Sequence, residues 1–256
     1  MKIKLQAAIV AALACAFAAV PLSAQAIYYT AGHGDLGVSY HPGDTTFGIH
    51  WGLDAGATVD GATLTTHTEY AENEVIAWTT ATTSLPSSSE TWLGVASGPV
   101  WRLGSDPYPP NLGFNSSGAG IPELWLDTTL AITLTGWNTP DGGEVALRSG
   151  TIPTALTLFS TYDAESTLDN NTWAFDMSVG HIHLVWYFSV AGTYELTFNW
   201  AGTYLGGDTP QEVTGTGTFT FIAGDLPPAI PESATWAAMS GIAVLGLVAW
   251  RRRHRS

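Results

Sequence analysis

Histidine is the residue type in this chain whose spacing could do chemistry. Six of its seven histidines lie between the two terminal segments, and two of them, His181 and His183, stand two positions apart. Alternate residues of a β-strand point to the same face of a sheet, so these two imidazoles would project together. His33 and Asp35 have the same spacing and would share a face if residues 32–35 are extended.

Two such pairs on neighbouring strands would present three imidazoles and one carboxylate, a donor set suited to tetrahedral zinc. We therefore predict a metal site at His33, Asp35, His181 and His183. Imidazole also suits copper and nickel, so the divalent cofactor stays open. The alternative interpretation is structural. In it, the histidines hydrogen-bond to backbone, and the Gly-His-Gly-Asp stretch is a turn capped by Asp35.

Motifs of common enzyme classes are absent from the sequence. It contains no Gly-x-Ser-x-Gly elbow, no His-Glu-x-x-His, no P-loop and no Gly-x-Gly-x-x-Gly after a predicted strand. Carboxylates are so frequent that no pair of them indicates a glycosidase. We therefore expect no enzymatic activity, and we interpret the other histidines of the body, His41, His50 and His67, as surface residues.

Period-2 alternation of apolar residues is the main secondary-structure signal. It is clearest over residues 193–200, where Tyr194, Leu196, Phe198 and Trp200 would share one face. A turn at Ala191-Gly192 would pair this strand with residues 181–188 as a hairpin. Further strands are expected over residues 36–40, 45–53, 74–79, 130–135, 155–162 and 214–222.

Many short strands joined by turn residues favour an all-β fold, an antiparallel β-sandwich of immunoglobulin or jelly-roll type. Residues 27–222 are long enough for one such domain with a full core. The stretches 82–90 and 104–122 are interpreted as long irregular loops. Residues 223–230, with two adjacent prolines, are interpreted as a semi-rigid spacer.

The N-terminal segment, residues 1–26, is interpreted as a secretory signal peptide that forms a helix. Lys2 and Lys4 precede an apolar stretch over residues 7–20, and Ala24-Gln25-Ala26 is a small-x-small cleavage site. The mature chain would begin at Ile27. The single cysteine, Cys15, lies in the removed segment, so the mature protein would contain no disulfide.

The C-terminal segment, residues 231–256, has three parts. Pro231-Glu232 precedes an uncharged stretch over residues 234–250, which is long enough for a transmembrane helix. A basic cluster that should stay cytoplasmic follows, formed by Arg251, Arg252, Arg253 and Arg255. This arrangement resembles the PEP-CTERM signal of Gram-negative bacteria. The resemblance implies processing by an exosortase near Pro231-Glu232, whereas the alternative is a membrane anchor that is never cleaved.

Between these two segments the chain is strongly acidic. Residues 27–230 contain two basic side chains, Arg102 and Arg148, and 21 carboxylates, a formal charge of −19. Such a surface would repel nucleic acid and has almost nothing to neutralise phosphates, which excludes a nucleic-acid partner. It would keep an exported protein soluble and could attract divalent cations.

Five stretches of the body occur in a recognisable order. They are Gly-His-Gly-Asp-Leu-Gly at residues 32–37, Thr-Glu-Tyr-Ala-Glu at 68–72, Gly-Pro-Val-Trp at 98–101, Asn-Leu-Gly-Phe-Asn at 111–115 and His-Ile-His-Leu-Val-Trp-Tyr-Phe at 181–188. Together they resemble the choice-of-anchor M domain of surface-anchored proteins. The resemblance implies a surface domain with no established enzymatic activity, and the family's association with metal-type transporters favours a metal site.

We therefore expect an exported, non-enzymatic protein of the cell surface or extracellular matrix, with a structural or adhesive role. Its expected partners are an exosortase-type enzyme and, during sorting, the inner membrane. One alternative is a surface protein that binds a zinc-type metal. A second is a module that binds extracellular polysaccharide through some of its nine body tryptophans, although Trp186 and Trp200 are expected in the core.

Overall fold

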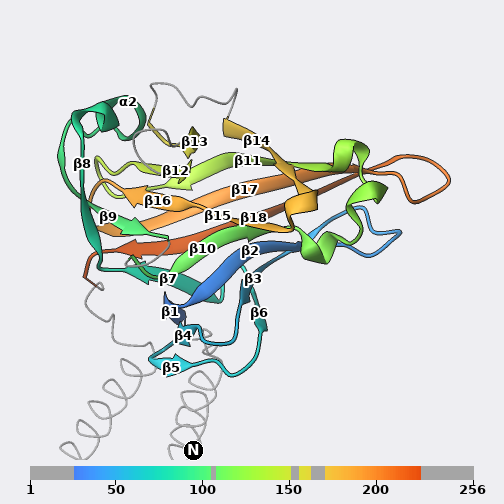
Figure 1. Cartoon of the computed structure of the whole chain (residues 1–256), viewed down its shortest axis with the longest axis horizontal. Helices are drawn as coiled ribbons and strands as arrows, with labels where there is room; N and C mark the ends of the chain where they lie inside the picture. Colours follow the sequence, from blue (N-terminus) through green and yellow to red (C-terminus); the bar gives the residue numbers. More distant parts are fainter. Residues whose placement is uncertain (1–25, 105–107, 151–155, 163–170, 226–256) are drawn as a thin grey trace, which may run out of the picture. The chain divides into compact units, whose positions relative to one another are not determined.

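The computed structural model describes residues 26–104, 108–150, 156–162 and 171–225 (Figure 1). These residues belong to one compact unit, Gln25–Leu226. The expected signal segment up to Gln25 and the sorting tail, with Pro231, Glu232 and its arginines, lie outside the described residues. Within the described residues, no helix is long and apolar enough to cross a membrane.

The largest sheet has eight strands in the order β14-β11-β17-β18-β7-β1-β4-β5. They are β1 (Ile27–Ala31), β4 (Thr58–Val59), β5 (Ala62–Thr63), β7 (Val75–Thr79), β11 (Thr129–Asn138), β14 (Thr172–Asp176), β17 (Gly192–Tyr204) and β18 (Gln211–Ala223). β17 and β18 pair along their whole 13-residue length. This long hairpin forms the middle of the eight-stranded sheet.

Two further sheets have five strands each. The first, called here the histidine sheet, has the order β15-β10-β2-β3-β6 and consists of β2 (His33–Ser39), β3 (Gly48–Leu53), β6 (Thr68–Ala71), β10 (Asn111–Asn115) and β15 (His181–His183). The second has the order β13-β12-β16-β9-β8 and consists of β8 (Thr82–Leu85), β9 (Gly98–Leu103), β12 (Val145–Ser149), β13 (Leu156–Ser160) and β16 (Val185–Phe188).

Short helices connect some of these strands. They are η2 (Ser87–Ser89), α2 (Glu90–Leu93), η3 (Ser117–Ala119), η4 (Pro122–Leu124), η5 (Leu126–Thr128) and η7 (Met177–Val179). Strands therefore dominate the described residues, and the all-β prediction is confirmed.

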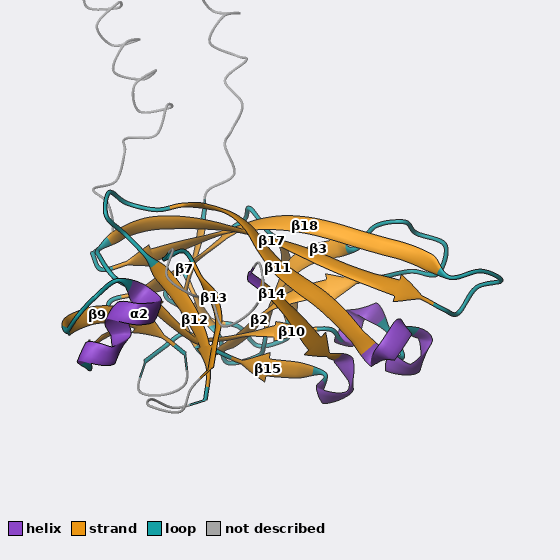
Figure 2. Cartoon of the chain, turned by 90° about the horizontal axis from the view of Figure 1, so that it is seen from above, coloured by secondary structure: helices purple, strands orange, loops and turns teal. Residues whose placement is uncertain are grey.

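The sheets pack face to face around one aromatic core. Phe114 of the histidine sheet contacts Phe198 and Trp200 of the eight-stranded sheet, with ring centroids 5.3 and 6.0 Å apart, and Trp186 of the second five-stranded sheet at 6.0 Å. Each of these rings is at most 1% exposed. Figure 2 shows the long β17–β18 pair on one side of the body and β10 with β15 on the other. The expected core positions of Trp186 and Trp200 are confirmed.

The prediction of a purely antiparallel sheet order is wrong. β7 lies between β1 and β18 and pairs with both in parallel. β10 also pairs in parallel with β2. Parallel neighbours need long connections through other layers, so turn residues between adjacent strands could not reveal them.

The predicted hairpin between residues 181–188 and 193–200 is also wrong. Residues 181–188 split into β15 and β16, which belong to different sheets, and neither pairs with β17. Instead, Phe188 packs on Tyr194 across the interior, with ring centroids 4.9 Å apart. Both segments present aromatic faces to the core, so they face each other and do not share an edge. By contrast, strands are confirmed at the six other predicted segments.

The stretch 104–122, interpreted as a loop, contains a missed strand. Asn111–Asn115 forms β10, the strand between β15 and β2 in the histidine sheet. Leu112 and Phe114 are fully buried on its inner face. Its five residues, between proline- and glycine-rich flanks, are too few for an alternating pattern to be recognised in the sequence. This strand nevertheless lies between the two strands that carry the predicted metal-ligand pairs.

Candidate metal centre

Histidines gather on the outer face of the histidine sheet. The inner face carries Leu36, Trp51 and Phe114, which are fully buried. Because side chains alternate, the neighbouring positions of the same strands point outward. Pairing places His183, Gly113 and Asp35 in one row across β15, β10 and β2, and it places His181, Asn115, Gly37 and His50 in the next row. Five of the six body histidines are on or beside this face: His33, His50, His67, His181 and His183.

Three of the four predicted ligands form a compact group of imidazoles. One ring nitrogen from each of His33, His181 and His183 lies within 4.8 Å of the other two. The His33 and His183 Nε2 atoms are only 2.6 Å apart. Two nitrogens on one tetrahedral zinc ion lie roughly 3.3 Å apart, so small ring rotations would let these three surround an ion. We call this group the three-histidine centre.

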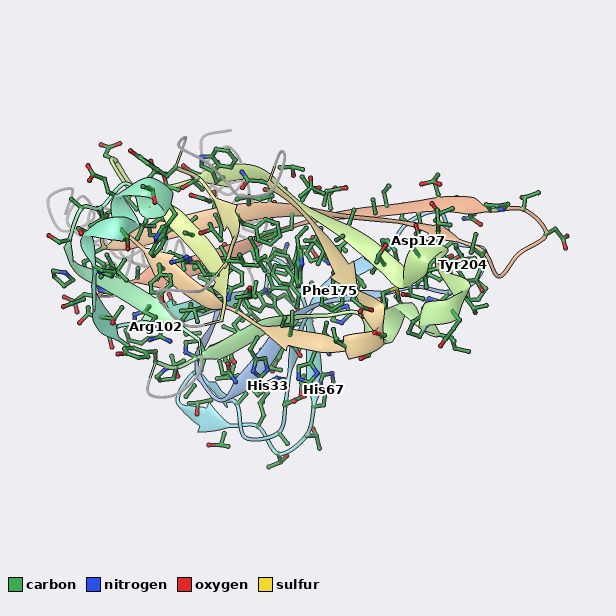
Figure 3. The ribbon with its side chains drawn as sticks, turned by 45° about the horizontal axis from the view of Figure 1, so that its top comes forward. His33, His67, Arg102, Asp127, Phe175 and Tyr204 are labelled. Atoms are coloured by element: carbon green, nitrogen blue, oxygen red, sulfur yellow. The ribbon has the colours of Figure 1, made fainter. Side chains whose placement is uncertain are left out.

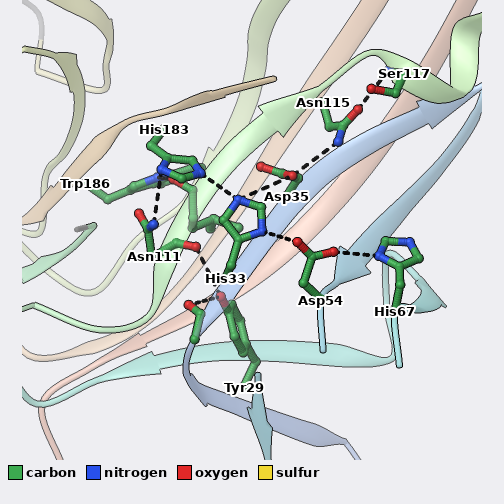
Figure 4. A network of polar contacts seen from close by, with 12 residues as sticks. Tyr29, His33, Asp35, Asp54, His67, Asn111, Asn115, Ser117, His183 and Trp186 are labelled. Atoms are coloured by element: carbon green, nitrogen blue, oxygen red, sulfur yellow. Dashed lines mark hydrogen bonds and ion pairs between the residues drawn. The ribbon is translucent and has the colours of Figure 1, made fainter. Parts of the chain in front are cut away.

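Asp54 orients His33 from behind. Its Oδ2 atom accepts a hydrogen bond from His33 Nδ1 at 2.7 Å, and its Oδ1 atom accepts one from His67 Nδ1 at 2.8 Å (Figure 4). With the proton on Nδ1, the Nε2 lone pair of each imidazole is available to a ligand. A carboxylate behind a histidine is the usual outer partner of a metal-bound imidazole. The hydrogen bond from His67, and then the charge and hydrogen bond of His33, lower the pKa of the half-exposed Asp54.

Asp35, the fourth predicted ligand, lies beside the three histidines and is buried. Its carboxylate is 4% exposed, and Oδ2 is 3.9 Å from His33 Nε2 and 3.2 Å from the Asn115 amide nitrogen. Its Oδ1 is buried and has no hydrogen-bond partner among the described residues. Figure 4 shows this oxygen on the side of the carboxylate that faces His183. A buried carboxylate oxygen without a partner is costly unless a cation binds it.

Gly113 makes room for this arrangement. It lies between Asp35 and His183 in the row across the sheet. A Cβ atom at this position would be 2.7 Å from Asp35 Oδ1 and 2.2 Å from the carbonyl oxygen of Ile182. Any larger residue would push the carboxylate and the β15 backbone away. Because Gly113 has no side chain, the Asp35 and His183 side chains can approach each other across its backbone.

Asn111 contacts His183, the last of the four candidate ligands. The Asn111 side-chain nitrogen is 3.1 Å from His183 Nδ1, and its Oδ1 atom is buried without a partner among the described residues. Burial, followed by the charge of the neighbouring His33, lowers the pKa of His183 below its usual 6.5. This imidazole is therefore neutral at pH 7, which is the form that binds metals.

The four candidate ligands could be chosen from the sequence, but the residues that contact them could not. His33, Asp35, His181 and His183 are brought together, as predicted from their i, i+2 spacing. His41 is a surface residue, with 85% of its side chain exposed. The interpretation of His50 is wrong, because only 17% of its side chain is exposed. His67 is half exposed but belongs to the Asp54 network, as Figure 3 shows by its place next to His33.

The tryptophans do not form an exposed stacking surface. Of the nine in the described body, only Trp137 is classed as exposed, with 48% of its surface accessible. Five are buried: Trp51, Trp92, Trp125, Trp186 and Trp200. Aromatic platforms for sugar rings need several open ring faces, so nothing here favours the polysaccharide alternative.

Comparisons with protein-family models, with curated proteins and with solved structures found no match for this chain. The assignment of the site therefore depends on its own geometry and chemistry.

Proposed function

We propose that this protein binds a divalent transition metal through His33, Asp35, His181 and His183. The observation that carries the proposal is the three-histidine centre itself, with one ring nitrogen of each imidazole within 4.8 Å of the others. Zinc fits three imidazoles and a carboxylate, and copper or nickel would also bind them. The function is metal capture at the outside of the cell, by a non-enzymatic surface or matrix protein.

In the structure, the Asn111 side-chain nitrogen lies 3.1 Å from His183 Nδ1 and the Nε2 atoms of His183 and His33 are 2.6 Å apart, so these groups are paired without a cation. Binding a cation requires His183 to hold its proton on Nδ1 instead. A proton that His183 holds on Nδ1 would need an acceptor, and the unpartnered Oδ1 of Asn111 becomes that acceptor if the amide turns over. The Nε2 lone pairs of His183 and His33 would then both be available to a cation, and the 2.6 Å between these atoms would open to the roughly 3.3 Å of two nitrogens on one zinc ion. Asp54 already fixes His33 in the same form.

The location of the centre suits exchange of the ion with the surroundings. His181 is exposed and His183 is half-buried, and both lie on the short edge strand β15. Structural zinc sites are closed by buried ligands, whereas this one has an open side. The acidic body, with a formal charge of −19 for residues 27–230, would concentrate cations near it. Export, supported by the two terminal segments of the sequence, would place the site where metals are scavenged.

The test is zinc binding by the full-length chain, purified without a polyhistidine tag in a mild detergent. Zinc at 100 times its dissociation constant should raise the free energy of unfolding by about 2.7 kcal/mol. For a domain of this size the melting temperature should rise by roughly 5–11 °C, since 1 kcal/mol shifts it by about 2–4 °C. A chelator should reverse the shift.

Three variants sharpen this test. The His181→Ala/His183→Ala double variant should lose the tight binding, and the exposed His41→Ala variant should keep it. Asn111→Ala should weaken binding by about 10–100-fold, the usual effect of removing an outer partner. Equal zinc affinity in the native chain and the double variant would refute the proposal.

A further inference from the structure

A second pocket lies beside the three-histidine centre on the same outer face. Its volume is about 160 Å³, and its walls include Asp35, His50, His67, Glu69 and Asn115. These residues come from four of the five strands of the histidine sheet or from their flanks. Since the volume share of one water is about 30 Å³, the pocket has room for a small ion with several waters.

The floor of this pocket is backbone. Gly37 and Gly52 line it, and the ring of His50 lies over Gly37 while the ring of His67, just before β6, lies over Gly52. A Cβ atom on Gly37 would be 2.6 Å from His50 Nε2. The two glycines thus keep side chains out of the space where polar groups converge.

Glu69 is placed between two imidazoles without bonding to either. Its Oε1 atom is 3.8 Å from His50 Nε2 and 3.9 Å from His67 Nε2. Both distances are too long for hydrogen bonds. They exceed the roughly 3.3 Å between two nitrogens on one tetrahedral zinc ion, and they suit donors that share a cation with water completing its coordination.

Both histidines are prepared as ligands. Asp54 accepts the Nδ1 hydrogen of His67 at 2.8 Å, as it does for His33, and so leaves the His67 Nε2 lone pair available. The His50 side chain, of which only 17% is exposed, lines the same pocket with its Nε2 atom over Gly37. One carboxylate therefore orients one imidazole toward each of two neighbouring sites.

We propose that this pocket binds a second divalent cation, partly hydrated, held by Glu69, His50 and His67. The donors are spaced more widely than in the three-histidine centre, and waters complete the coordination. The second ion is bound more weakly, and Asp54 links the two sites. The pocket has its own ligands, so this proposal stands apart from the function proposed above.

The test counts zinc ions bound to the full-length chain by equilibrium dialysis and atomic emission. The native chain should bind two ions, one tightly and one about 10-fold or more weakly. His50→Gln/Glu69→Gln should lose only the weak ion, and His181→Ala/His183→Ala should lose only the tight one. Asp54→Asn should weaken both by about 10–100-fold. Glu123→Gln, which removes an exposed carboxylate elsewhere, is the matched control.

Each other result has a definite meaning. A native chain with one ion, lost only in the His181→Ala/His183→Ala variant, overturns the second site and leaves the proposed function intact. One ion lost only in His50→Gln/Glu69→Gln supports the second site and refutes the three-histidine centre. Two ions retained in His50→Gln/Glu69→Gln overturn the second site. Should that variant fail to fold, His67→Ala, a change at a half-exposed side chain, takes its place.

Discussion

At the scale of single residues, Asp54 is the centre of the polar face. Each of its carboxylate oxygens accepts one imidazole N–H, from His33 and from His67. It follows β3 directly, in no recognisable motif, and lies 21 residues from His33 and 13 from His67. Spacing predicts neighbours within one strand, but only strand pairing brings Asp54 between two histidines. For this reason the proximity of the candidate ligands could be predicted from the sequence, and the position of Asp54 between two histidines could not.

His50 should make folding sensitive to mild acid. Its imidazole has a pKa lowered by burial, so the unfolded chain takes up a proton at a higher pH than the folded protein does. Its contribution to stability is therefore complete above about pH 6.5 and decreases as the pH falls below that value. Denaturant unfolding with a chelator present, at pH 7.5 and 5.5, should show a smaller loss of stability in His50→Gln than in the native chain.

The lowered pKa of His183 acts in the same direction and remains in that variant. The native chain and His50→Gln should therefore both lose stability on acidification, but by different amounts. An identical loss in the two proteins would show that His50 is protonated equally in the folded and unfolded states.

At the scale of strands, alternation predicted which residues lie inside, and failed to predict which strands are neighbours. Tyr194, Leu196, Phe198 and Trp200 are buried on one face of β17, as the period-2 pattern indicated. The same pattern cannot distinguish two strands that share an edge from two that face each other across a core. Residues 181–188 and 193–200 are the second case, because the chain crosses between sheets after Phe188.

Tyr194 stabilises this crossing between sheets. Its hydroxyl donates a hydrogen bond to the Val190 carbonyl at 2.8 Å and accepts one from the Val190 N–H at 3.2 Å. Tyr194→Phe would leave both backbone groups without these partners, so the free energy of unfolding should fall by about 1–3 kcal/mol. Tyr28→Phe is the control, and urea unfolding is the measurement. Equal midpoints for the two variants would contradict this role.

At the scale of the whole molecule, the described body is one compact unit, Gln25–Leu226, and the sequence predicts a targeting segment on either side of it. The targeting prediction depends on composition and on short motifs, which fold geometry does not address. Parallel strand pairs, by contrast, are set by long connections through the other layers, and no local pattern indicated them.

The targeting prediction can be tested by the mass of the mature protein. In a Gram-negative host with an exosortase, intact-mass spectrometry should find an N-terminus at Ile27 and a C-terminus near Pro231-Glu232. A host without the enzyme, or a Pro231→Ala/Glu232→Ala variant, should retain the C-terminal segment in the membrane fraction. A mature protein that keeps Arg251–Arg255 in the first host would instead favour a permanent anchor.

The position of β7 between β1 and β18 has a mechanical consequence. All three strands run in the same direction, so the start of β1 at Ile27 and the end of β18 at Ala223 lie at opposite ends of one ladder. A pull on these two points acts along the strands and loads their hydrogen bonds in shear. The bonds then resist together and do not open one after another. If the protein is exported and held at its C-terminal side, as the sequence predicts, tension between these two points would be borne by the whole ladder at once.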